Sequence, residues 1–489
     1  MTQLFDFLYS QENNDKFAIY INDTYVTYRE FKNSVFSIAN ELKNLPHAQN
    51  KIGVYLNDSI YSYASIYAIW ITGNIYVPLH SSYPEKRLKE IASQADLSCI
   101  LSSEQAANLP LDYSLIRTDN LNNDSVVMPY THTETDLFHI LFTSGSTGVP
   151  KGVQISYNNI VSFLGHIEFL QLGLTSNSGF LQPFDLTFDL SILSTLLPFI
   201  HQGTLYHVSS TSVKYLEIYR LLEDFAIEFA IIVPSVLNML KNYFDSIQLD
   251  SLKAVALSGE AVPIELTEKW QKCCPNARFF NFYGPTECTI FCTCYEIPRK
   301  RILHRNGIVS IGLPTIFSSS LLLDENMDEV SSSFKGELWI GGAQVSKGYI
   351  NNQALNDVLF KEINGSVYYN TGDIVERDEE NNLFYLGRKD QQIKRNGFRI
   401  ELSEIEYKAS LALNVQTCVI SKIQQASIDI ILVLVKDSFQ KELISEALKT
   451  HLPAFMIPNV VMEIDEFPLN DNGKLDRKKI SQLYDSSKI

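Results

Sequence analysis

The chain has 489 residues, of which 45% are hydrophobic and 20% charged, and its formal net charge at pH 7 is −16. At roughly 150 residues per domain, this length allows about two to four domains or subdomains with a sizeable core. Because an acidic surface repels polyanions, the charge argues against nucleic acid or an anionic membrane as a partner.

Nothing in the sequence indicates export or insertion into a membrane. The N-terminal segment lacks a basic region followed by an apolar one, and no run of about 18 apolar residues occurs. Seven cysteines are scattered along the chain without a Cys-x-x-Cys pair. An odd number without paired spacing is typical of reduced thiols rather than of disulfides or a zinc site. We therefore expect a cytoplasmic protein.

Strand-like and helix-like segments alternate along most of the chain. Amphipathic patterns predict helices at residues 31–42 and 85–95, and short apolar runs predict buried strands at 52–56, 76–77, 230–233 and 254–257. This alternation indicates an α/β fold with largely parallel sheets.

The pattern becomes more β-like from about residue 338. Turn signals at 364–365 and 379–382 predict hairpins. After residue 390 we expect a charged helix at 401–413 and a strand at 430–435.

The most informative segment is the loop LFTSGSTGVPKG at residues 141–152. Its glycines would let backbone N–H groups approach a bound group, its Ser and Thr hydroxyls add donors, and Lys151 adds a positive charge. Together these groups suit a polyphosphate. The spacing is not that of a Walker A loop, because Gly152 rather than Ser or Thr follows the lysine. Taken alone, the segment is equally compatible with a flexible surface loop.

Further motifs follow this loop along the chain. They are NFYGPTE at 281–287, GELWIGG at 336–342, YNTGD at 369–373, GRKDQQIK at 387–394, GFRIE at 397–401 and PLNDNGKLDR at 468–477. With the loop, they resemble the motifs of the adenylate-forming superfamily, which includes acyl-CoA synthetases, luciferases and the amino-acid adenylation domains of nonribosomal peptide synthetases. The resemblance covers nearly the whole chain.

The resemblance also implies a domain organisation within the α/β class. A large N-terminal domain at 1–389 would consist of αβ-layered subdomains and a β-barrel-like subdomain. A small, mobile α+β domain would follow at 390–489.

By the same resemblance the chain would catalyse a two-step reaction with ATP and Mg²⁺. A carboxylate would first attack the α-phosphate of ATP to give an acyl-adenylate and pyrophosphate, and the acyl group would then pass to a thiol. Because the first step brings two anions together, it needs charge neutralisation and alignment. Between the steps the C-terminal domain would rotate about Asp390, which removes Lys474 from the active site and brings the segment around Gly397 to it.

The positions that match the family's motifs receive roles by resemblance. Lys474 would be the catalytic lysine, and Glu287 would bind Mg²⁺. The residues expected to hold the leaving phosphates are Thr143, Ser144, Gly145, Ser146, Thr147, Gly148 and Lys151. The residues expected to bind adenine and ribose are Gly259, Glu260, Ala261, Asn281, Phe282, Tyr283, Gly284, Thr286, Asp373 and Arg388.

Asp189 indicates which class of carboxylic acid the chain would activate. By resemblance to amino-acid adenylation domains, it would pair with the α-ammonium group of an amino acid, which a fatty acid lacks. It could instead cap the helix that begins near Leu190. The side chains expected to line the substrate pocket are Phe188, Leu190, Leu193, Ile231, Ala256, Ser258, Phe282, Ile290 and Phe291. No acid, base or amide is among them, so a compact apolar amino acid is expected, with proline first and alanine or valine next.

The expected partner of the second step is a separate carrier protein with a phosphopantetheine arm. The chain shows no Gly-Gly-x-Ser carrier-attachment motif and no condensation domain before the adenylation unit, so we expect loading in trans by a monomer or weak dimer. Proline–carrier protein ligases of antibiotic biosynthesis and D-alanine–carrier protein ligases of cell-wall modification share this layout.

Two rival interpretations remain open. A carboxylic acid–CoA ligase would have no use for Asp189. A catalytically inactive binding homologue would not need Lys151, Glu287, Asp373 and Lys474, all of which are present.

Overall fold

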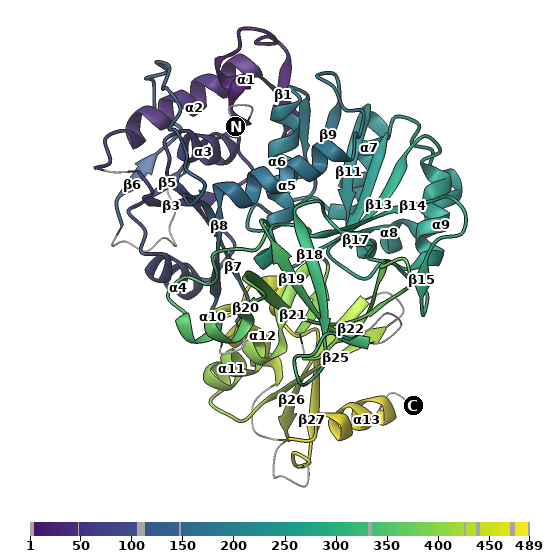
Figure 1. Ribbon diagram of the computed structural model, residues 1–489. Helices are drawn as coiled ribbons and strands as arrows, with labels where there is room; N and C mark the ends of the chain where they lie inside the picture. Colours follow the sequence, from purple (N-terminus) through teal and green to yellow (C-terminus); the bar gives the residue numbers. More distant parts are fainter. Residues whose placement is uncertain are drawn as a thin grey trace.

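The protein folds into two layered α/β units, a β unit and a smaller α+β unit at the C-terminal end (Figure 1). The computed structural model describes residues 4–46, 48–104, 113–145, 148–330, 335–390, 392–424, 427–436, 441–469 and 475–487. None of the helices in these ranges is long and apolar enough to cross a membrane.

The larger sheet has nine strands and is parallel from β13 across to β1, with antiparallel strands added at both edges. Its strands, in spatial order, are β17 (Leu313–Pro314), β14 (Thr293–Ile297), β13 (Arg278–Tyr283), β12 (Ala254–Ser258), β11 (Ile227–Ile232), β9 (Gly179–Gln182), β10 (Thr204–His207), β1 (Phe17–Ile21) and β2 (Thr24–Thr27). Every residue of β12 is buried, as expected for a central parallel strand covered on both faces. The strands predicted at 230–233 and 254–257 are confirmed as β11 and β12.

The second sheet has six strands and ends in an antiparallel hairpin that carries the glycine-rich loop. Its strands, in spatial order, are β6 (Leu115–Arg117), β5 (Cys99–Ser102), β3 (Lys51–Leu56), β4 (Ile75–His80), β7 (Leu137–Thr143) and β8 (Lys151–Ser156). The predictions at 52–56 and 76–77 correspond to β3 and to the middle of β4.

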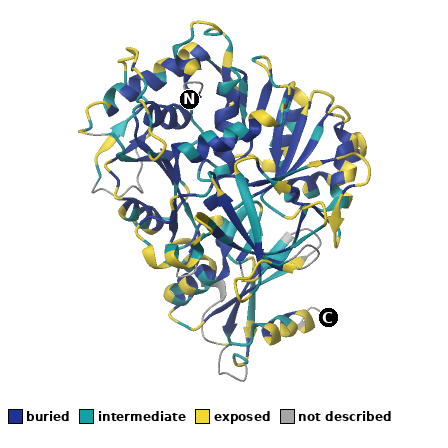
Figure 2. Ribbon diagram, viewed as in Figure 1, coloured by how far each residue is buried: buried dark blue, intermediate teal, exposed yellow. Residues whose placement is uncertain are grey.

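Helices cover and separate the two sheets. Those of the first two units are α1 (Asp6–Tyr9), α2 (Tyr28–Leu42), α3 (Ile60–Ile71), α4 (Glu85–Ala95), α5 (Tyr157–Phe169), α6 (Asp189–Ile200), α7 (Lys214–Asp224), α8 (Pro234–Leu240), α9 (Ile264–Cys273) and the 3-10 helices η2 (Lys241–Ser246) and η3 (Thr286–Cys288). The helices predicted at 31–42 and 85–95 are confirmed as α2 and α4. Helix α5 packs on β7 and β8 and helix α6 on β9 and β10, so both lie between the sheets (Figure 1). The buried residues in Figure 2 concentrate on these strands and helices.

A twisted β unit follows and has its own core around Leu338, Ile340 and Val375. Its strands are β18 (Ser318–Leu323), β19 (Lys335–Gly342), β21 (Ser366–Arg377), β20 (Phe360–Ile363) and β22 (Leu383–Arg388), with a small hairpin of β15 (His304–Arg305) and β16 (Ile308–Val309) and the helix α10 (Gln353–Leu359). Both predicted hairpin turns are confirmed, since residues 364–365 join β20 to β21 and residues 379–382 lie between β21 and β22.

The C-terminal unit contains the hairpin of β23 (Gln392–Arg395) and β24 (Phe398–Glu401), the sheet of β25 (Cys418–Gln424), β26 (Ser427–Val435) and β27 (Val460–Ile464), and the helices α11 (Leu402–Leu413), α12 (Lys441–Lys449), η4 (Ala454–Met456) and α13 (Arg477–Ser487). The predicted helix at 401–413 is α11, with Glu401 as its N-cap residue, and the predicted strand at 430–435 lies within β26. Two separate hydrophobic clusters form the core of this unit. The exact domain boundary at Asp390 stays a prediction.

Candidate active site

The glycine-rich loop connects β7 to β8, whose pairing places Thr143 opposite Lys151. A Cβ atom on Gly145 would lie 1.8 Å from the carbonyl oxygen of Val149, so only glycine fits there. Gly148 has φ +80°, a conformation that side chains rarely adopt, and its N–H donates to the carbonyl of Gly145 at 3.0 Å. Both positions therefore favour glycine, and the Lys151 side chain is buried.

The C-terminal unit packs directly on this loop. The N–H of Gly145 donates to Glu404 Oε2 at 3.0 Å. The hydroxyl of Ser144 donates to the carbonyl of Arg399 at 3.0 Å and accepts the N–H of Glu401 at 3.1 Å. Lys151 Nζ lies 3.5 Å from Glu401 Oε1. The groups of the loop that suit an anion thus face two carboxylates of the C-terminal unit.

Glu287 lies in η3, beside the loop, with 0% of its side chain exposed. It accepts a hydrogen bond from Tyr349 Oη at 2.5 Å and forms an ion pair with Arg399 Nη1 at 2.6 Å. Burial alone would raise the pKa of Glu287, but the positive charges of Arg399 and Lys151 lower it to about 2. The carboxylate is therefore ionised and surrounded by groups that neutralise its charge.

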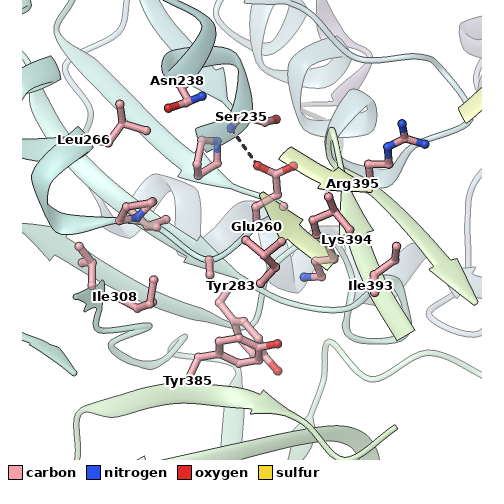
Figure 3. Close-up of a pocket in the computed structure, with 18 of the residues that line it drawn as sticks. Ser235, Asn238, Glu260, Leu266, Tyr283, Ile308, Tyr385, Ile393, Lys394 and Arg395 are labelled. Atoms are coloured by element: carbon pink, nitrogen blue, oxygen red, sulfur yellow. Dashed lines mark hydrogen bonds between the residues drawn. The ribbon is translucent and has the colours of Figure 1, made fainter. Parts of the chain in front are cut away.

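A cavity of about 810 Å³ opens between the first units and the C-terminal unit (Figure 3). The residues predicted for adenine and ribose that line it are Gly259, Glu260, Ala261, Asn281, Phe282, Tyr283, Asp373 and Arg388. Asp390, the predicted hinge residue, also lines this cavity, together with residues 392–396 of the C-terminal unit. The structure thus brings together most of the predicted adenine and ribose set.

One wall of this cavity is a polar network. Tyr283 Oη donates to Asp373 Oδ2, and Arg388 Nη1 donates to Asp373 Oδ1 at 2.9 Å. Arg388 also forms an ion pair with Asp390 at 2.6 Å. Lys394 extends toward Tyr283, with Nζ 5.7 Å from the ring centroid (Figure 3). Burial lowers the pKa of Lys394, although the charge of Asp373 opposes that shift.

Glu260 joins the two sides of the cavity. One carboxylate oxygen accepts the N–H of Ser235, at the start of α8, at 2.8 Å (Figure 3). The other accepts the N–H of Gly397 at 2.9 Å. Because Asn396 and Gly397 have φ 53° and 81°, they form the tight turn between β23 and β24 that presents this N–H.

Asp189 is the first residue of α6. Its carboxylate accepts the hydroxyl of Thr286 at 2.7 Å. Burial raises the pKa of Asp189, whereas hydrogen bonds from Thr286 and from the N–H of Leu190 lower it. Asp189 therefore also contacts the first turn of α6. A small cavity of about 50 Å³ is lined by Phe188, Asp189 and Thr286 together with Thr143 and Ser144 of the loop.

Of the predicted substrate-pocket residues, Phe188 lines this small cavity, and the others do not. Leu190, Leu193, Ile231, Ala256, Phe282, Ile290 and Phe291 belong to one hydrophobic core, and Phe188 packs against it. The rings of Phe282 and Phe291 are stacked with centroids 3.9 Å apart. The hydroxyl of Ser258 donates to the carbonyl of Phe282 at 2.8 Å, so it is satisfied within this otherwise apolar set.

Three predicted residues lie outside the described part of the chain. They are Ser146 and Thr147 of the loop and the proposed catalytic Lys474.

Sequence reasoning missed the charged residues that join the two parts of the molecule. Arg87 in α4 donates to Glu404 Oε1 at 2.7 Å, and Lys408 in α11 forms an ion pair with Glu90 at 2.6 Å. Arg399 lies in the recognised motif GFRIE, but no function could be assigned to it from the sequence. The available signal was the charged pair two residues apart in GFRIE, which a strand places on one face.

The fold and this site define a class of enzyme. The sequence model of the AMP-binding enzymes matches residues 9–350, so the chain belongs to that family. It is an adenylate-forming ligase that uses ATP and Mg²⁺, as the motifs predict.

The most similar relatives include carrier protein ligases. A D-alanine–D-alanyl carrier protein ligase from Bacillus licheniformis is 31% identical over 496 residues, covering 97% of both chains. One from Bacillus cereus is 30% identical over 494 residues, covering 96% of both. These relatives favour the D-alanine alternative and give no support to proline.

Solved structures of adenylation domains share the fold. The Vibrio cholerae adenylation domain AlmE, in complex with glycyl-adenosine-5′-phosphate, has a TM-score of 0.84 at 22% identity, covering 99% of this chain and 97% of its own. The fused adenylation–carrier protein NpsA-ThdA from Klebsiella oxytoca has a TM-score of 0.83 at 23% identity, covering 94% and 92%. The predicted α/β fold with a smaller C-terminal domain is thereby confirmed.

Proposed function

We propose that the chain activates D-alanine as its adenylate and passes the alanyl group to the phosphopantetheine thiol of a separate carrier protein. The Bacillus relatives, which align with almost the whole chain, support both the amino acid and the carrier protein. The observation that carries the proposal is the small cavity that Asp189 shares with Thr143 and Ser144. An amino acid bound there would have its ammonium group at a carboxylate and its own carboxylate at the phosphate loop.

The surroundings of Asp189 support a small side chain. Among the predicted pocket side chains, the rings of Phe282 and Phe291 are stacked, and the one hydroxyl, that of Ser258, is already hydrogen-bonded. A buried polar side chain without a partner would cost about 1–3 kcal/mol. The methyl side chain of alanine is small and apolar. Alanine therefore fits this environment better than a charged or amide-bearing amino acid.

The first step joins the substrate carboxylate to the α-phosphorus. A carboxylate oxygen forms the new bond while the bond from that phosphorus to the β-phosphate oxygen breaks, and pyrophosphate leaves with the electron pair. The Gly145 N–H, the hydroxyls of Thr143 and Ser144, and the Lys151 ammonium would hold the leaving phosphates. Lys474 would neutralise the negative charge that gathers on the reacting groups.

Glu287 fits the role of a magnesium ligand. Its carboxylate is buried and ionised. The positive charges of Arg399 and Lys151 lie close to it. The described residues hold no cluster of three or more metal-binding side chains, and Mg²⁺ is commonly bound by one or two carboxylates with phosphate oxygens and water. When bound, Mg²⁺ neutralises charge on the phosphates.

The adenosine of ATP would occupy the cavity of about 810 Å³. Tyr283 would stack on adenine with Asn281 near the edge of the base, and Asp373 and Arg388 would bind the ribose hydroxyls. Residues 259–261, Phe282, Gly284 and Thr286 would shape the surroundings.

In the second step the thiol sulfur bonds to the acyl carbon, the bond from that carbon to the phosphate oxygen breaks, and AMP leaves. The thiol proton is released to solvent. Gly397 already lies at the cavity through its bond to Glu260, the arrangement expected for this step. Asp390, between β22 and β23, would be the hinge for the other orientation.

The test is amino-acid-dependent ATP–pyrophosphate exchange with D-alanine, L-alanine, glycine, L-valine and L-proline. We expect D-alanine to give the highest kcat/KM, by about tenfold or more over each of the others. A preference for L-proline would overturn the assignment of the substrate. No exchange with any amino acid, together with CoA-dependent activity on a simple carboxylic acid, would overturn the assignment of Asp189.

A further inference from the structure

The segment that leads to Asp189 has no helix or strand of its own. Residues 183–188 connect β9 to α6, and Asp189 is the first residue of that helix. Phe188, the N-cap residue, gives the helix no side-chain hydrogen bond. The position of the Asp189 carboxylate therefore depends on what holds residues 185–187.

Within this loop, Asp185 fixes the local turn. Its Oδ1 atom accepts both the N–H and the hydroxyl of Thr187, each at 2.8 Å, and its carbonyl accepts the N–H of Phe188 at 2.9 Å. This is the pattern in which an aspartate side chain hydrogen-bonds the backbone two residues further on. These bonds define the shape of the loop, but they do not attach it to the rest of the molecule.

Two tyrosines of the other α/β unit attach the loop. Tyr76 in β4 donates its hydroxyl hydrogen to the carbonyl of Leu186 at 3.0 Å, and Tyr83, just after β4, donates to Thr187 Oγ1 at 3.2 Å. Burial raises the pKa of both phenols, that of Tyr83 to about 12. Both hydroxyls therefore stay protonated and act as donors at neutral pH.

His80, the last residue of β4, lies at the first residue of the attached segment. The backbone N–H of Ser82 donates to His80 Nδ1 at 3.0 Å, so Nδ1 is an acceptor and the ring proton lies on Nε2. His80 Nε2 lies 3.0 Å from Asp185 Oδ2. Each of residues 185–187 thus has a partner in β4 or in the turn that follows it.

The strand β4 also lies beside the strand that carries the phosphate loop. It pairs in parallel with β7, which ends at Thr143. The cavity of about 50 Å³ is lined by Thr143 and Ser144 of that loop and by Thr187 and Asp189. Because an amino acid carries its carboxylate and its ammonium group on the same carbon, the groups that bind them must be held at a fixed separation.

We propose that Tyr76, His80 and Tyr83 are positioning residues, which hold the loop before Asp189 at a fixed separation from the phosphate loop. This inference rests on the amino-acid activation proposed above. Neither Tyr76 nor His80 lines the cavity of about 50 Å³, so both act through the loop rather than on the substrate. Loss of either contact lets Asp189 move and weakens amino-acid binding, while the groups that bind ATP keep their places.

The variant Tyr76→Phe removes one hydroxyl and leaves the ring in place. It is assayed by ATP–pyrophosphate exchange with the amino acid that the unmodified protein uses best. We expect the KM for that amino acid to rise by about fivefold or more, because the loop loses a buried hydrogen bond. The kcat and the KM for ATP should each change by less than about twofold.

The matched control is Tyr28→Phe. The Tyr28 hydroxyl is also buried and donates to a backbone carbonyl, that of Gly203, at 2.7 Å, but beyond the far end of α6. Its loss should lower the thermal stability about as much as Tyr76→Phe does and leave the KM for the amino acid unchanged. An unchanged KM in Tyr76→Phe, or an equal rise in both variants, would overturn the proposal.

Two changes at His80 test its contact with Asp185 separately. His80→Gln keeps an N–H donor near the place of Nε2, whereas His80→Asn keeps an acceptor near the place of Nδ1 and does not reach Asp185. We expect His80→Asn to raise the KM for the amino acid by about threefold or more and His80→Gln to resemble the unmodified protein. The same KM in both variants would overturn the role of His80.

A second readout needs no amino acid. The N–H groups of Thr187 and Phe188 are hydrogen-bonded within the loop, so deuterium exchange of a peptide that covers residues 183–190 reports how firmly the loop is held. We expect exchange to be faster by about fivefold or more in Tyr76→Phe and unchanged in Tyr28→Phe. Equal exchange in Tyr76→Phe and the unmodified protein would overturn the proposal. Faster exchange in Tyr76→Phe, with no amino-acid-dependent activity of the unmodified protein, would support the positioning and contradict the proposed function instead.

Discussion

Asp189 and Glu287 are two carboxylates within one site whose surroundings differ. Glu287 contacts Arg399 directly, and burial, Arg399 and Lys151 together set its pKa. Asp189 instead accepts a hydrogen bond from the hydroxyl of Thr286, and burial raises its pKa. A buried carboxylate without a directly paired cation is suited to receive one from a substrate.

Asp189→Asn should therefore weaken binding of the amino acid selectively. Loss of a buried charge pair costs about 2 kcal/mol or more, so we expect KM for the amino acid to rise by about 30-fold or more. KM for ATP should change little, because the phosphate and adenosine groups are untouched. Both KM values are measured by ATP–pyrophosphate exchange, with the exposed Asp250→Asn variant as control. An unchanged KM for the amino acid would show that Asp189 does not bind its ammonium group.

The depressed pKa of Glu287 predicts a dependence of stability on pH. Burial opposes ionisation, but Arg399 and Lys151 bring the pKa from 4.5 to about 2 in the folded state. Since the folded pKa is the lower one, the stabilisation is fully present above pH 4.5 and is lost as the pH falls toward 2. In urea unfolding, the stability difference between the protein and Glu287→Gln should be constant near neutral pH and shrink below about pH 4.5. A difference that does not change with pH would contradict this electrostatic account.

At the scale of elements, the hairpin of β7 and β8 supports the site. Its antiparallel pairing holds Thr143 opposite Lys151, and Gly145 lets the chain turn against Val149. The shape of the loop therefore depends on a steric condition at one residue.

Gly145→Ala should distort this loop and impair the first step. Its Cβ would meet the Val149 carbonyl oxygen at 1.8 Å, so the backbone must move and the Gly145 N–H with it. We expect kcat/KM for ATP to fall by about 100-fold, equal to roughly 2.7 kcal/mol. Gly173→Ala is the control, because it has φ +69° but open space around it; it should cost about 1 kcal/mol of stability and leave KM for ATP unchanged. Equal effects of both changes on ATP would show that only general strain matters.

Many of the helices and turns could be predicted from the sequence. The helix expected at 85–95 has the bounds Glu85–Ala95 in the structure, because its amphipathic period is a local property. The turn at residues 364–365 followed from Asn-Gly, whose positive φ values of 52° and 78° suit a tight hairpin. The loop at 141–152 was found through its glycines and lysine.

The contacts between distant segments could not be predicted in the same way. Arg87 and Glu404 are 317 residues apart, and neither pattern around them differs from that of an ordinary exposed helix. Their pairing depends on how the C-terminal unit lies against α4, which no local period encodes. Among the motif residues, the sequence indicated phosphate and magnesium chemistry but not that Arg399 would contact Glu287.

At the scale of the whole molecule, the candidate active site lies where separately folded units meet. The cavity of about 810 Å³ has walls from the nine-stranded sheet, the β unit and the C-terminal hairpin. A movement of the C-terminal unit would therefore change which residues line the cavity, and no hydrophobic core would have to unfold. This arrangement suits an enzyme that performs two reactions in sequence.

The most direct test of the whole account is the intact mass of a D-alanyl carrier protein bearing phosphopantetheine, after incubation with the enzyme, ATP, Mg²⁺ and D-alanine. We predict that the carrier protein gains the mass of one alanyl group, that the gain requires ATP, and that hydroxylamine, which cleaves thioesters, removes it. An unchanged carrier protein, with alanine or another acid transferred to CoA instead, would contradict the account.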